Sequence, residues 1–316
     1  MQVPGTFVGV DVAKAHLVVA IDGQPGCRTI GNAAAAIDGW LDALPAGSCI
    51  AVESTGAHHL LLVQRAVAAG FKAYVLNARD VFFYAKALGA RGKTDRSDAA
   101  VIARYLAEHH ANLRPYSLPT EVQAQVDQLL GQRWTVVNKR TSLRQALKAC
   151  QLGEAASDLD AAFERMLKAI DQRIQQLIAT DRQLEQTQRL LRTITGVGAQ
   201  SSALLATLLH RIPFTNSDAL VAYSGLDPRA NDSGTKQGRR KLSKRGSPGL
   251  RKQMYLVAFA ACHSKALGPT YKALRAKGFQ TTEAMIILAR KLLRAAYAVW
   301  KTQTTFDVSK LGPKTP

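Results

Sequence analysis

Four carboxylates stand at positions where a soluble protein seldom places them. Asp95 and Asp98 lie three residues apart in the first turn of a helix predicted over residues 95–105, on the stripe of that helix that should be buried. Asp11 interrupts the apolar strand FVGVDVA, and Glu53 lies near the end of a second such strand, IAVES. Burying a carboxylate is costly unless a positive charge compensates it, so these acids need an explanation.

Together, the four acids predict a divalent-metal site. If adjacent central strands bring Asp11 and Glu53 side by side, and the helix after GKTD lays its first turn over their ends, all four carboxylates converge. Like charges that close require a divalent cation, and ligation by carboxylates alone suits Mg²⁺ or Mn²⁺. Two such ions about 4 Å apart can bind the attacking and the leaving oxygen of a phosphodiester. Taken singly, each acid also has an ordinary interpretation, as a turn cap (Asp11), an arginine's partner (Glu53) or a favourable charge at a helix N-terminus (Asp95 and Asp98).

A glycine-rich basic segment is a second candidate site. Residues 223–252 hold nine basic residues from Arg229 onward against one acid, Asp232. Their five glycines predict a loop whose backbone can approach a phosphate. So dense a positive charge is typical of nucleic-acid contact, a solvated basic loop being the alternative. The composition does not decide which hydroxyl would be a nucleophile; the candidates are Ser233, Ser224, Ser243, Ser247, Tyr223 and Tyr255.

The acids must be positioned by the elements of the first third of the chain. Residues 7–21 predict a β-hairpin, with a third strand at residues 28–30, and strands then alternate with helices. The predicted order is a helix over residues 34–44, a strand over 49–55, a helix over 59–69, a strand over 73–78 and a helix over 81–88. This pattern favours a mixed sheet covered by helices, as in RNase H-like folds, and an α/β domain over residues 1–113.

The rest of the chain predicts an all-α part that begins with an arm. Residues 119–190 carry apolar residues at heptad spacing, which predicts an antiparallel helical hairpin or coiled coil broken near residues 152–157. We interpret residues 114–190 as a dimerisation arm rather than a spacer, because their apolar seam is too narrow to fill a globular core.

A helical domain is predicted over residues 191–302. It begins with a G-x-G turn at Gly196 and Gly198, which suits a helix-hairpin-helix that binds phosphate at a helix N-terminus. Residues 250–300 predict two amphipathic helices, and the buried face of the second comprises Met285, Leu288, Leu292, Ala296 and Val299. Residues 303–316 are polar and predict a flexible tail.

The charge of the chain predicts a polyanionic partner. The 316 residues are 47% hydrophobic, as expected of a folded protein of two or three domains, and 42 Lys and Arg against 23 Asp and Glu give a net charge of +19. Residues 1–113 hold 10 basic and 9 acidic residues, so the remaining 32 basic and 14 acidic residues place +18 on residues 114–316. Such an excess favours nucleic acid over a membrane surface.

The sequence also disfavours several classes of protein. The four cysteines are far apart and form no C-x-x-C pair, so neither a zinc site nor a disulfide framework is expected. The N-terminal MQVPGTF lacks the basic and apolar parts of a signal peptide, and no apolar run is long enough to cross a membrane. We therefore expect a cytoplasmic protein, associated with the bacterial nucleoid and without a membrane partner.

Taken in order, the motifs resemble those of one protein family. GVDVAK, VESTG, GKTDRSDA, ITGVG, YSGLDPR, SGTKQGRRKLSKRG and LRKQMY follow one another over about residues 7–307, as in the DEDD transposases of the IS110 insertion-sequence family, relatives of the Piv-type DNA invertases. The resemblance implies a RuvC-like domain, a coiled-coil arm, and a helical transposase domain whose nucleophile is Ser233. The implied acidic tetrad comprises Asp11, Glu53, Asp95 and Asp98.

The resemblance also implies partners and a mechanism. Metal-bound acids of one protomer would activate the serine of another within a dimer of dimers, and strands would be exchanged through a covalent phosphoserine. A structured guide RNA, the bridge RNA, would pair with target and donor DNA, which leaves the protein to read shape and backbone. The residues expected to contact nucleic acid are Arg91, Lys93, Lys236, Arg239, Arg240, Lys241, Lys244, Arg245, Arg251 and Lys252. A short, irregular joint at residues 153–158 departs from the family pattern in the arm.

Two other functions stay open on the sequence alone. A RuvC-like nuclease would resolve branched DNA with metal-activated water, and Ser233 would then be incidental. A non-catalytic nucleic-acid-binding scaffold would hold the acids for structural reasons. Replacing Ser233 separates the recombinase from the nuclease, and replacing Asp11 separates both enzymes from the scaffold.

Overall fold

The structure is a computed structural model. It describes residues 5–54, 56–89, 92, 94–150, 153–230, 232–234, 236–238 and 240–311. The chain divides into two compact units, residues 1–118 and residues 119–316. No helix in the described part of the chain is long and apolar enough to cross a membrane.

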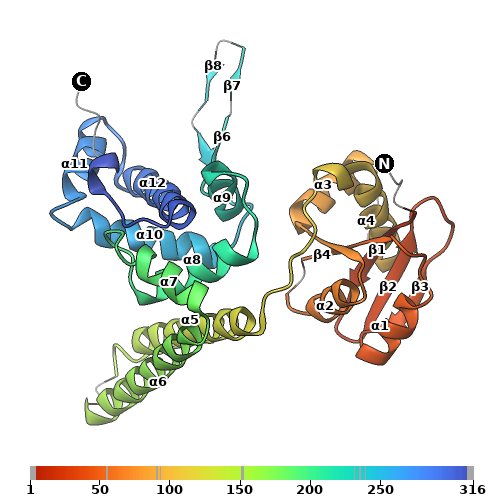
Figure 1. The fold of residues 1–316 in the computed structure, drawn as a ribbon, viewed down its shortest axis with the longest axis horizontal. Helices are drawn as coiled ribbons and strands as arrows, with labels where there is room; N and C mark the ends of the chain where they lie inside the picture. The colour runs from red at the N-terminus through yellow and green to blue at the C-terminus, as the bar shows by residue number, and fades with distance from the viewer. Residues whose placement is uncertain are drawn as a thin grey trace. The chain divides into compact units, whose positions relative to one another are not determined.

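The first unit is built on a five-stranded mixed sheet (Figure 1). Its strands are β1 (Phe7–Val12), β2 (His16–Ile21), β3 (Arg28–Gly31), β4 (Cys49–Glu53) and β5 (Lys72–Leu76), in the order β3-β2-β1-β4-β5. The first three strands pair antiparallel, and β4 and β5 add parallel strands beside β1. An antiparallel meander extended by parallel strands through helical crossovers is the RNase H-like arrangement, so the predicted fold class is confirmed.

Helices cover both faces of this sheet. They are α1 (Ala34–Leu41), α2 (Leu60–Ala68), α3 (Ala78–Ala87) and α4 (Asp95–His109), with a short 3-10 helix η1 (His110–Asn112). α1 and α2 pack on the face that presents Val8 and Val10 of β1. α3 and α4 pack on the opposite face, in a cluster with Cys49 and Ala51 of β4. Because side chains alternate along a strand, β1 and β4 each divide their residues between two cores.

The second unit is helical apart from a narrow β-ribbon. Its helices are α5 (Glu121–Ala146), α6 (Gly153–Ala179), α7 (Arg182–Leu191), α8 (Ala199–Arg211), α9 (Ser217–Ser224), α10 (Pro248–Cys262), α11 (Gly268–Ala276) and α12 (Thr281–Thr302). The prediction of two helices over residues 250–300 is wrong, because Pro269 in the first turn of α11 starts a separate helix. The predicted buried face of α12 is confirmed at Met285, Leu288, Leu292, Ala296 and Val299.

α5 and α6 form an antiparallel helical pair. Arg133 of α5 donates to Asp171 of α6 at 2.7 Å, and Arg140 of α5 donates to Asp160 of α6 at 2.7 Å. The later residue of α5 thus pairs with the earlier residue of α6, as expected for antiparallel helices. At its base the pair is not separate from the other helices, since Ile174 belongs to the same hydrophobic cluster as buried residues of α7, α8, α9, α10 and α12. The predicted narrow seam therefore widens into a core at one end.

The C-terminal segment packs on this core as far as Leu311. The amide of Phe306 donates to Thr193 Oγ1 at 2.8 Å, and the side chains of Phe306 and Leu311 pack against the helical core. A 3-10 helix, η2 (Val308–Leu311), ends the described chain. Two apolar side chains are enough to dock a segment whose polar composition predicts a flexible tail.

Candidate active site

Asp11 and Glu53 lie on neighbouring strands at one end of the sheet. β1 and β4 pair in parallel with Val10 opposite Val52, so the next residue of each strand places Asp11 beside Glu53. Both residues are half-buried. The register therefore brings two of the four predicted acids together from positions 42 residues apart in the chain.

Both acids occupy positions on the face of the sheet that α4 covers. Side chains alternate along a strand, so Asp11 shares a face with Gly9, and Glu53 shares a face with Ala51. Gly9 lies directly beneath α4, because a Cβ atom there would come within 2.2 Å of backbone atoms of that helix. Ala51 packs in a cluster with Ile102 of α4. The helix that carries the other two acids thus crosses the strands that carry the first two.

The first turn of α4 is capped by hydroxyl groups. Ser97 N donates to Thr94 Oγ1 at 3.2 Å, and Thr94 N donates to Ser97 Oγ at 3.0 Å, which makes a reciprocal capping box. The cap bonds of this helix therefore need neither Asp95 nor Asp98. Their negative charges still interact favourably with the helix dipole, so this ordinary explanation is weakened but not removed.

His16 links the first turn of α4 to the acid end of the sheet. Its Nε2 atom lies 3.7 Å from Asp95 Oδ2. The Asp95 side chain is 62% exposed, so the prediction that it lies on the buried stripe of the helix is wrong, because the buried stripe of α4 begins only at Ala99. His16 begins β2 directly after the turn that follows β1, at the strand end where Asp11 lies. A shallow pocket beside this contact is lined by His16, Val18, Thr29, Thr94, Asp95 and Arg96. Sequence reasoning missed His16, whose only signal was its place just after the predicted hairpin turn.

The four acids share one end of the fold without forming a closed set of ligands. Among the described residues, no group of three or more Asp, Glu, His or Cys side chains is close enough to hold a metal ion. In kind, four carboxylates fit a divalent cation. Further back in the core beneath α4, burial raises the pKa of the Cys49 thiol and raises the pKa of Tyr74 to about 12, so both groups stay uncharged at neutral pH. The metal-binding tetrad stays a prediction.

Four two-residue strands between Pro228 and Leu242 form a narrow β-ribbon where a loop was predicted (Figure 1). Its strands are β6 (Pro228–Arg229), which pairs with β9 (Lys241–Leu242), and β7 (Asp232–Ser233), which pairs with β8 (Lys236–Gln237). The loop prediction is wrong because backbone pairing requires no apolar side chains, and Gly234, at φ +54°, supplies a tight turn. An ion pair of 2.8 Å between Arg240 and Asp232 joins the two sides of the ribbon.

Ser233 lies at the exposed end of this ribbon, in the last strand pair before the turn. The other candidate serines are differently placed. Ser224 is fully buried and donates to a backbone carbonyl at 2.6 Å, and Ser243 is 3% exposed and donates to the carboxylate of Asp227. Ser247 is exposed but caps α10. Among the four candidate serines, Ser233 is therefore the one that is both exposed and carried on the ribbon.

The root of the ribbon is fixed to the helical core. The Ser243 amide donates to Asp227 O at 2.9 Å, beside the bond between their side chains. A Cβ atom on Gly246 would come within 1.9 Å of Tyr223 O, so only glycine fits there. Gly225, at φ +68°, ends α9 in the left-handed conformation. Sequence reasoning noted these glycines as loop formers and missed their role as anchors.

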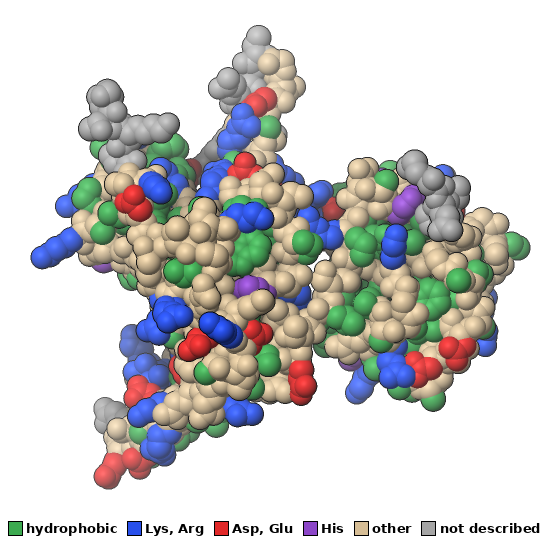
Figure 2. All heavy atoms as spheres, in the orientation of Figure 1, with side chains coloured by type: hydrophobic (Ala, Val, Ile, Leu, Met, Phe, Trp, Pro, Cys, Tyr) green, Lys and Arg blue, Asp and Glu red, His purple; other side chains and the backbone are tan. Residues whose placement is uncertain are grey.

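The predicted nucleic-acid contacts differ in their exposure and in the hydrogen bonds that they make. Arg240, Lys241, Lys244 and Arg245 are exposed on the ribbon or at its root. Arg251 is half-buried and donates to backbone carbonyls of the ribbon root, and Lys252 donates to Asn138 Oδ1 at 3.3 Å. Arg91, Lys93 and Arg239 lie outside the described residues, as does the side chain of Lys236. On the face drawn in Figure 2, Lys and Arg side chains lie along the α5–α6 pair and around the base of the ribbon.

The G-x-G turn between α7 and α8 has a packing explanation. A Cβ atom on Gly196, which is at φ +91°, would come within 2.4 Å of Val257 O in α10. Gly198 is the N-cap of α8, and its amide donates to Ser201 Oγ at 2.9 Å. Close packing and capping account for both glycines without phosphate binding.

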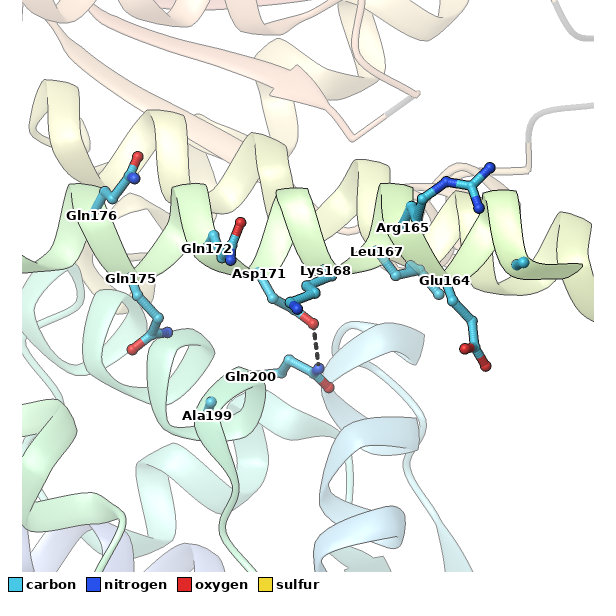
Figure 3. A pocket seen from close by; sticks show the side chains of 11 residues that line it. Glu164, Arg165, Leu167, Lys168, Asp171, Gln172, Gln175, Gln176, Ala199 and Gln200 are labelled. Carbon is cyan, nitrogen blue, oxygen red and sulfur yellow. Dashed lines mark hydrogen bonds between the residues drawn. The ribbon is translucent and has the colours of Figure 1, made fainter.

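A groove between α6 and α8, lined mainly by long side chains with polar ends, is a further feature of the helical unit (Figure 3). It is lined by Ala161, Glu164, Arg165, Leu167, Lys168, Asp171, Gln172, Gln175, Gln176, Ala199 and Gln200. Gln200 donates to Asp171 at 3.2 Å across the groove. The lining holds amides and charged groups but no hydroxyl or thiol, so the groove offers no alternative to Ser233 as nucleophile.

Comparisons with known proteins show that this protein is an enzyme that cleaves and rejoins DNA. Residues 8–153 match the family model of the DEDD transposases of IS110 type, and residues 188–273 match the model of the IS116/IS110/IS902 family of transposases. The two models follow each other along the chain, one over the acids and the other over the serine ribbon. The chain belongs to the IS110 family of transposases, as the order of its motifs implied.

Named relatives agree with this assignment. The chain is 26% identical over 316 residues to the pilin gene-inverting proteins of Moraxella lacunata and Moraxella bovis, which covers 96% of this chain and 98% of each relative. It is 29% identical over 154 residues to an IS110 insertion-element protein of Streptomyces coelicolor, over 48% of this chain and 37% of that protein. Two Thermus thermophilus RuvC structures, one with a Holliday junction, align over 35% of this chain with TM-scores of 0.27 and 0.26 and identities of 14% and 15%.

Proposed function

We propose that this chain is the recombinase of an insertion sequence and exchanges DNA strands through a covalent phosphoserine at Ser233. The observation that carries the proposal is the position of Ser233, at the exposed end of a basic ribbon whose root is fixed to a helical core. The neighbouring Ser224 and Ser243 are buried and hydrogen-bonded, so neither can reach a phosphate without unfolding its surroundings. The alignment of both family models with the two candidate sites supports the same function.

The proposed step replaces one phosphodiester bond by another, so the strand can be rejoined without an external energy source. The Ser233 oxygen forms a bond to a phosphorus atom of the DNA, and the bond from that phosphorus to a deoxyribose oxygen breaks. The serine proton leaves to a base, and the departing sugar oxygen takes up a proton. Attack by another sugar hydroxyl reverses the step and rejoins the strand to a new partner. A serine hydroxyl is a poor nucleophile, so a group that assists loss of its proton is required.

The acid end of the sheet is the proposed source of that assistance. Asp11, Glu53, Asp95 and Asp98 would hold Mg²⁺ or Mn²⁺, and Arg240 and Lys241 would contact the DNA backbone beside the serine. A bound cation supplies positive charge that stabilises the phosphate oxygens and favours the serine alkoxide. The side-by-side positions of Asp11 and Glu53, and the contact of Asp95 with His16 at the same strand end, support this assignment.

The proposal assigns a separate role to each domain of the chain and to each protomer of the assembly. Residues 1–113 would be the catalytic domain, 114–190 a coiled-coil dimerisation arm, 191–302 the transposase domain, and 303–316 a tail. As the resemblance to the family implies, each active site would combine the acids of one protomer with the serine of another in a dimer of dimers. A structured bridge RNA would select target and donor DNA by base pairing. Sequencing the RNA that co-purifies with the protein tests this part; a random population of cellular RNA would refute it.

Replacement of Ser233 tests the central step. Ser233→Ala should abolish recombination and the covalent protein–DNA species that denaturing gels detect after incubation with donor DNA. Ser247→Ala is the matched control, because Ser247 lies in the same basic segment and loses only its cap bond to Leu250. If Ser233→Ala still cuts DNA at the normal rate, the enzyme is a nuclease that uses water, and the proposal is wrong.

Thermal unfolding tests the acids without relying on activity. A cation that binds the folded chain raises its melting temperature by mass action, so saturating Mg²⁺ should stabilise the parent protein. Asp11→Asn should lose that shift, whereas Asp42→Asn should keep it, since Asp42 lies at the exposed end of α1 on the opposite side of the sheet. A shift of equal size in both variants would place the metal elsewhere. A scaffold would show no Mg²⁺ shift in any variant.

A further inference from the structure

We infer that α3 carries a binding site for unpaired bases of DNA, made of two exposed phenylalanines flanked by two cations. Phe82 and Phe83 are 55% and 54% exposed. Arg79, Phe82, Phe83 and Lys86 follow the spacing i, i+3, i+4, i+7, so the four side chains share one face of the helix. The two rings lie 5.4 Å apart and nearly perpendicular, at 74°. One ring can therefore stack on a base while the other meets the edge of that base.

Each ring has a cation beside it. Arg79 Cζ lies 5.5 Å from the centre of the Phe83 ring, and Lys86 Nζ lies 5.5 Å from the centre of the Phe82 ring. Both distances fall within the range of favourable cation–π contacts, which hold the long side chains over the patch. The patch thus offers an apolar surface for a base and positive charge for the phosphate that follows it.

The exposure of these rings is not a sign of a loosely attached helix. The opposite side of α3 is anchored by Val81, which is buried, and by Tyr84, whose hydroxyl donates to Glu108 at 2.6 Å. The Tyr84 ring also packs edge-on against Tyr105 of α4 at 5.1 Å. Burial raises the pKa of Tyr84 to about 12, so its proton is retained for the bond to Glu108. α3 is held firmly and presents both phenylalanines outward.

The charges on the patch favour a nucleic acid over a second protein as its partner. An apolar protein surface would strip water from Arg79 and Lys86 without compensating their charges, which is costly. A phosphate supplies the opposite charge, and aromatic rings beside cations bind single strands with little sequence preference. Residues 1–113 hold 10 basic and 9 acidic residues, so long-range attraction in this unit is weak and stacking must supply the affinity. The chain belongs to a transposase family, and strand exchange unpairs DNA bases, which commits the site to DNA.

A binding experiment with the full chain tests the site. Two labelled DNAs are compared, a duplex with a central unpaired bubble and the same duplex fully paired. The double variant Phe82→Ala, Phe83→Ala should bind the bubble about tenfold more weakly, as expected for the loss of one stacked base, and bind the paired duplex unchanged. The difference should persist at high salt, because stacking does not depend on counterion release. Phe82→Trp with Phe83→Trp should keep the preference for the bubble.

Leucine provides the decisive comparison, since it keeps an apolar side chain and removes the aromatic face. Phe82→Leu with Phe83→Leu should lose the preference for the bubble as the alanine pair does. Phe259→Leu is the matched control, because Phe259 is equally exposed, at 50%, on α10 of the other unit, and its loss should leave the preference intact. Full binding by the leucine pair, equal losses on both DNAs, or losses confined to a matched RNA bubble would each overturn the inference. This binding measurement does not depend on the chemistry of Ser233 or of the acids, so failure of the proposed recombinase chemistry would leave its result unchanged.

Discussion

Gly9 shows how a single residue determines where the candidate acids lie. α4 crosses β1 so closely that a Cβ atom on Gly9 would lie 2.2 Å from Ala99 O and Ala103 N. The close crossing places the first turn of α4, with Asp95 and Asp98, at the strand end that carries Asp11. A glycine in a central strand is otherwise unfavourable, and here the approach of the helix backbone explains it.

Replacement of Gly9 by alanine should therefore displace α4 and destabilise the first unit. Overpacking of this kind costs about 1–3 kcal/mol, and the melting temperature of the full chain should fall accordingly. Gly39→Ala is the matched control: Gly39 is exposed within α1 with open space around it, and alanine should raise stability by up to about 1 kcal/mol. The rate of DNA cleavage by Gly9→Ala should also be reduced at temperatures where the variant is still folded, because the displaced helix moves Asp95 and Asp98. Equal stability of the two variants would contradict this account of Gly9.

His210 predicts a loss of stability in mild acid. Its Nε2 atom is 2.8 Å from Thr187 Oγ1, and burial lowers the pKa of His210 below the usual value of about 6.5, with a smaller opposing effect of Asp181. The unfolded chain then binds a proton at a higher pH than the folded chain. Stability is therefore full above about pH 6.5 and falls as the pH drops towards the lowered value.

The test of this prediction is chemical unfolding of parent and variant at neutral pH and at about pH 5.5. His210→Gln keeps a hydrogen-bonding group near Thr187 but does not titrate, so it should lose less stability on acidification than the parent. His263→Gln, at an exposed histidine of the same unit, should behave like the parent. A parent and a His210→Gln variant with the same pH dependence would show that His210 is not the group responsible.

At the scale of elements, the regions with strong apolar periodicity could be predicted from the sequence. Strong apolar patterns mark the hairpin of β1 and β2, the strand β4 and the buried face of α12. In the structure each of these elements lies near its predicted bounds. The apolar runs around Asp11 and Glu53 predicted two central strands, and their adjacency was an assumption of the metal-site prediction. The structure shows that the two strands pair in parallel, in the register that places the two acids side by side.

Other features could not be predicted because they depend on tertiary contacts. The ribbon consists of two-residue strands with polar and basic side chains, which have no strand signal. His16 reaches Asp95 only through the pairing of β2 and the crossing of α4. The distances among the four carboxylates depend on the position of α4 along its own axis relative to the strand ends. No pattern in the sequence determines that position.

The α5–α6 pair should depend on Arg140. Its guanidinium forms paired bonds of 2.7 and 2.6 Å to Asp160 and a third of 2.8 Å to Glu164, and it lowers the pKa of Asp160. Arg140→Ala should therefore speed amide hydrogen exchange in the first turns of α6, measured by mass spectrometry. Arg144→Ala serves for comparison, since Arg144 is more exposed and lies 3.5 Å from the same carboxylate, and should have little effect. Equal exchange in the two variants would mean that apolar contacts alone hold the pair.

For the whole molecule, the positive charge is concentrated in the unit that carries the serine ribbon. Residues 119–316 hold 31 of the 42 basic and 14 of the 23 acidic residues. The two units thus differ in their capacity to attract DNA from a distance, and the first contact with DNA should be made by the helical unit. The acid end of the sheet belongs to the nearly neutral unit and would then meet DNA that the helical unit already holds.

DNA binding by the full chain should accordingly weaken steeply with salt, and the ribbon should account for part of the slope. Removal of one cation that binds a phosphate reduces the slope of log K against log salt concentration by about 0.9 for duplex DNA. Arg240→Gln with Lys241→Gln should reduce that slope by up to about 2, less if the ion pair of Arg240 with Asp232 persists on DNA. Arg28→Gln with Lys72→Gln removes the same charge from exposed positions of the first unit and should leave the slope unchanged. Titration of a labelled duplex at several salt concentrations measures the slope for both double variants. An equal decrease in slope for the two double variants would mean that the net charge of the chain, rather than contacts of the ribbon, determines the salt dependence of DNA binding.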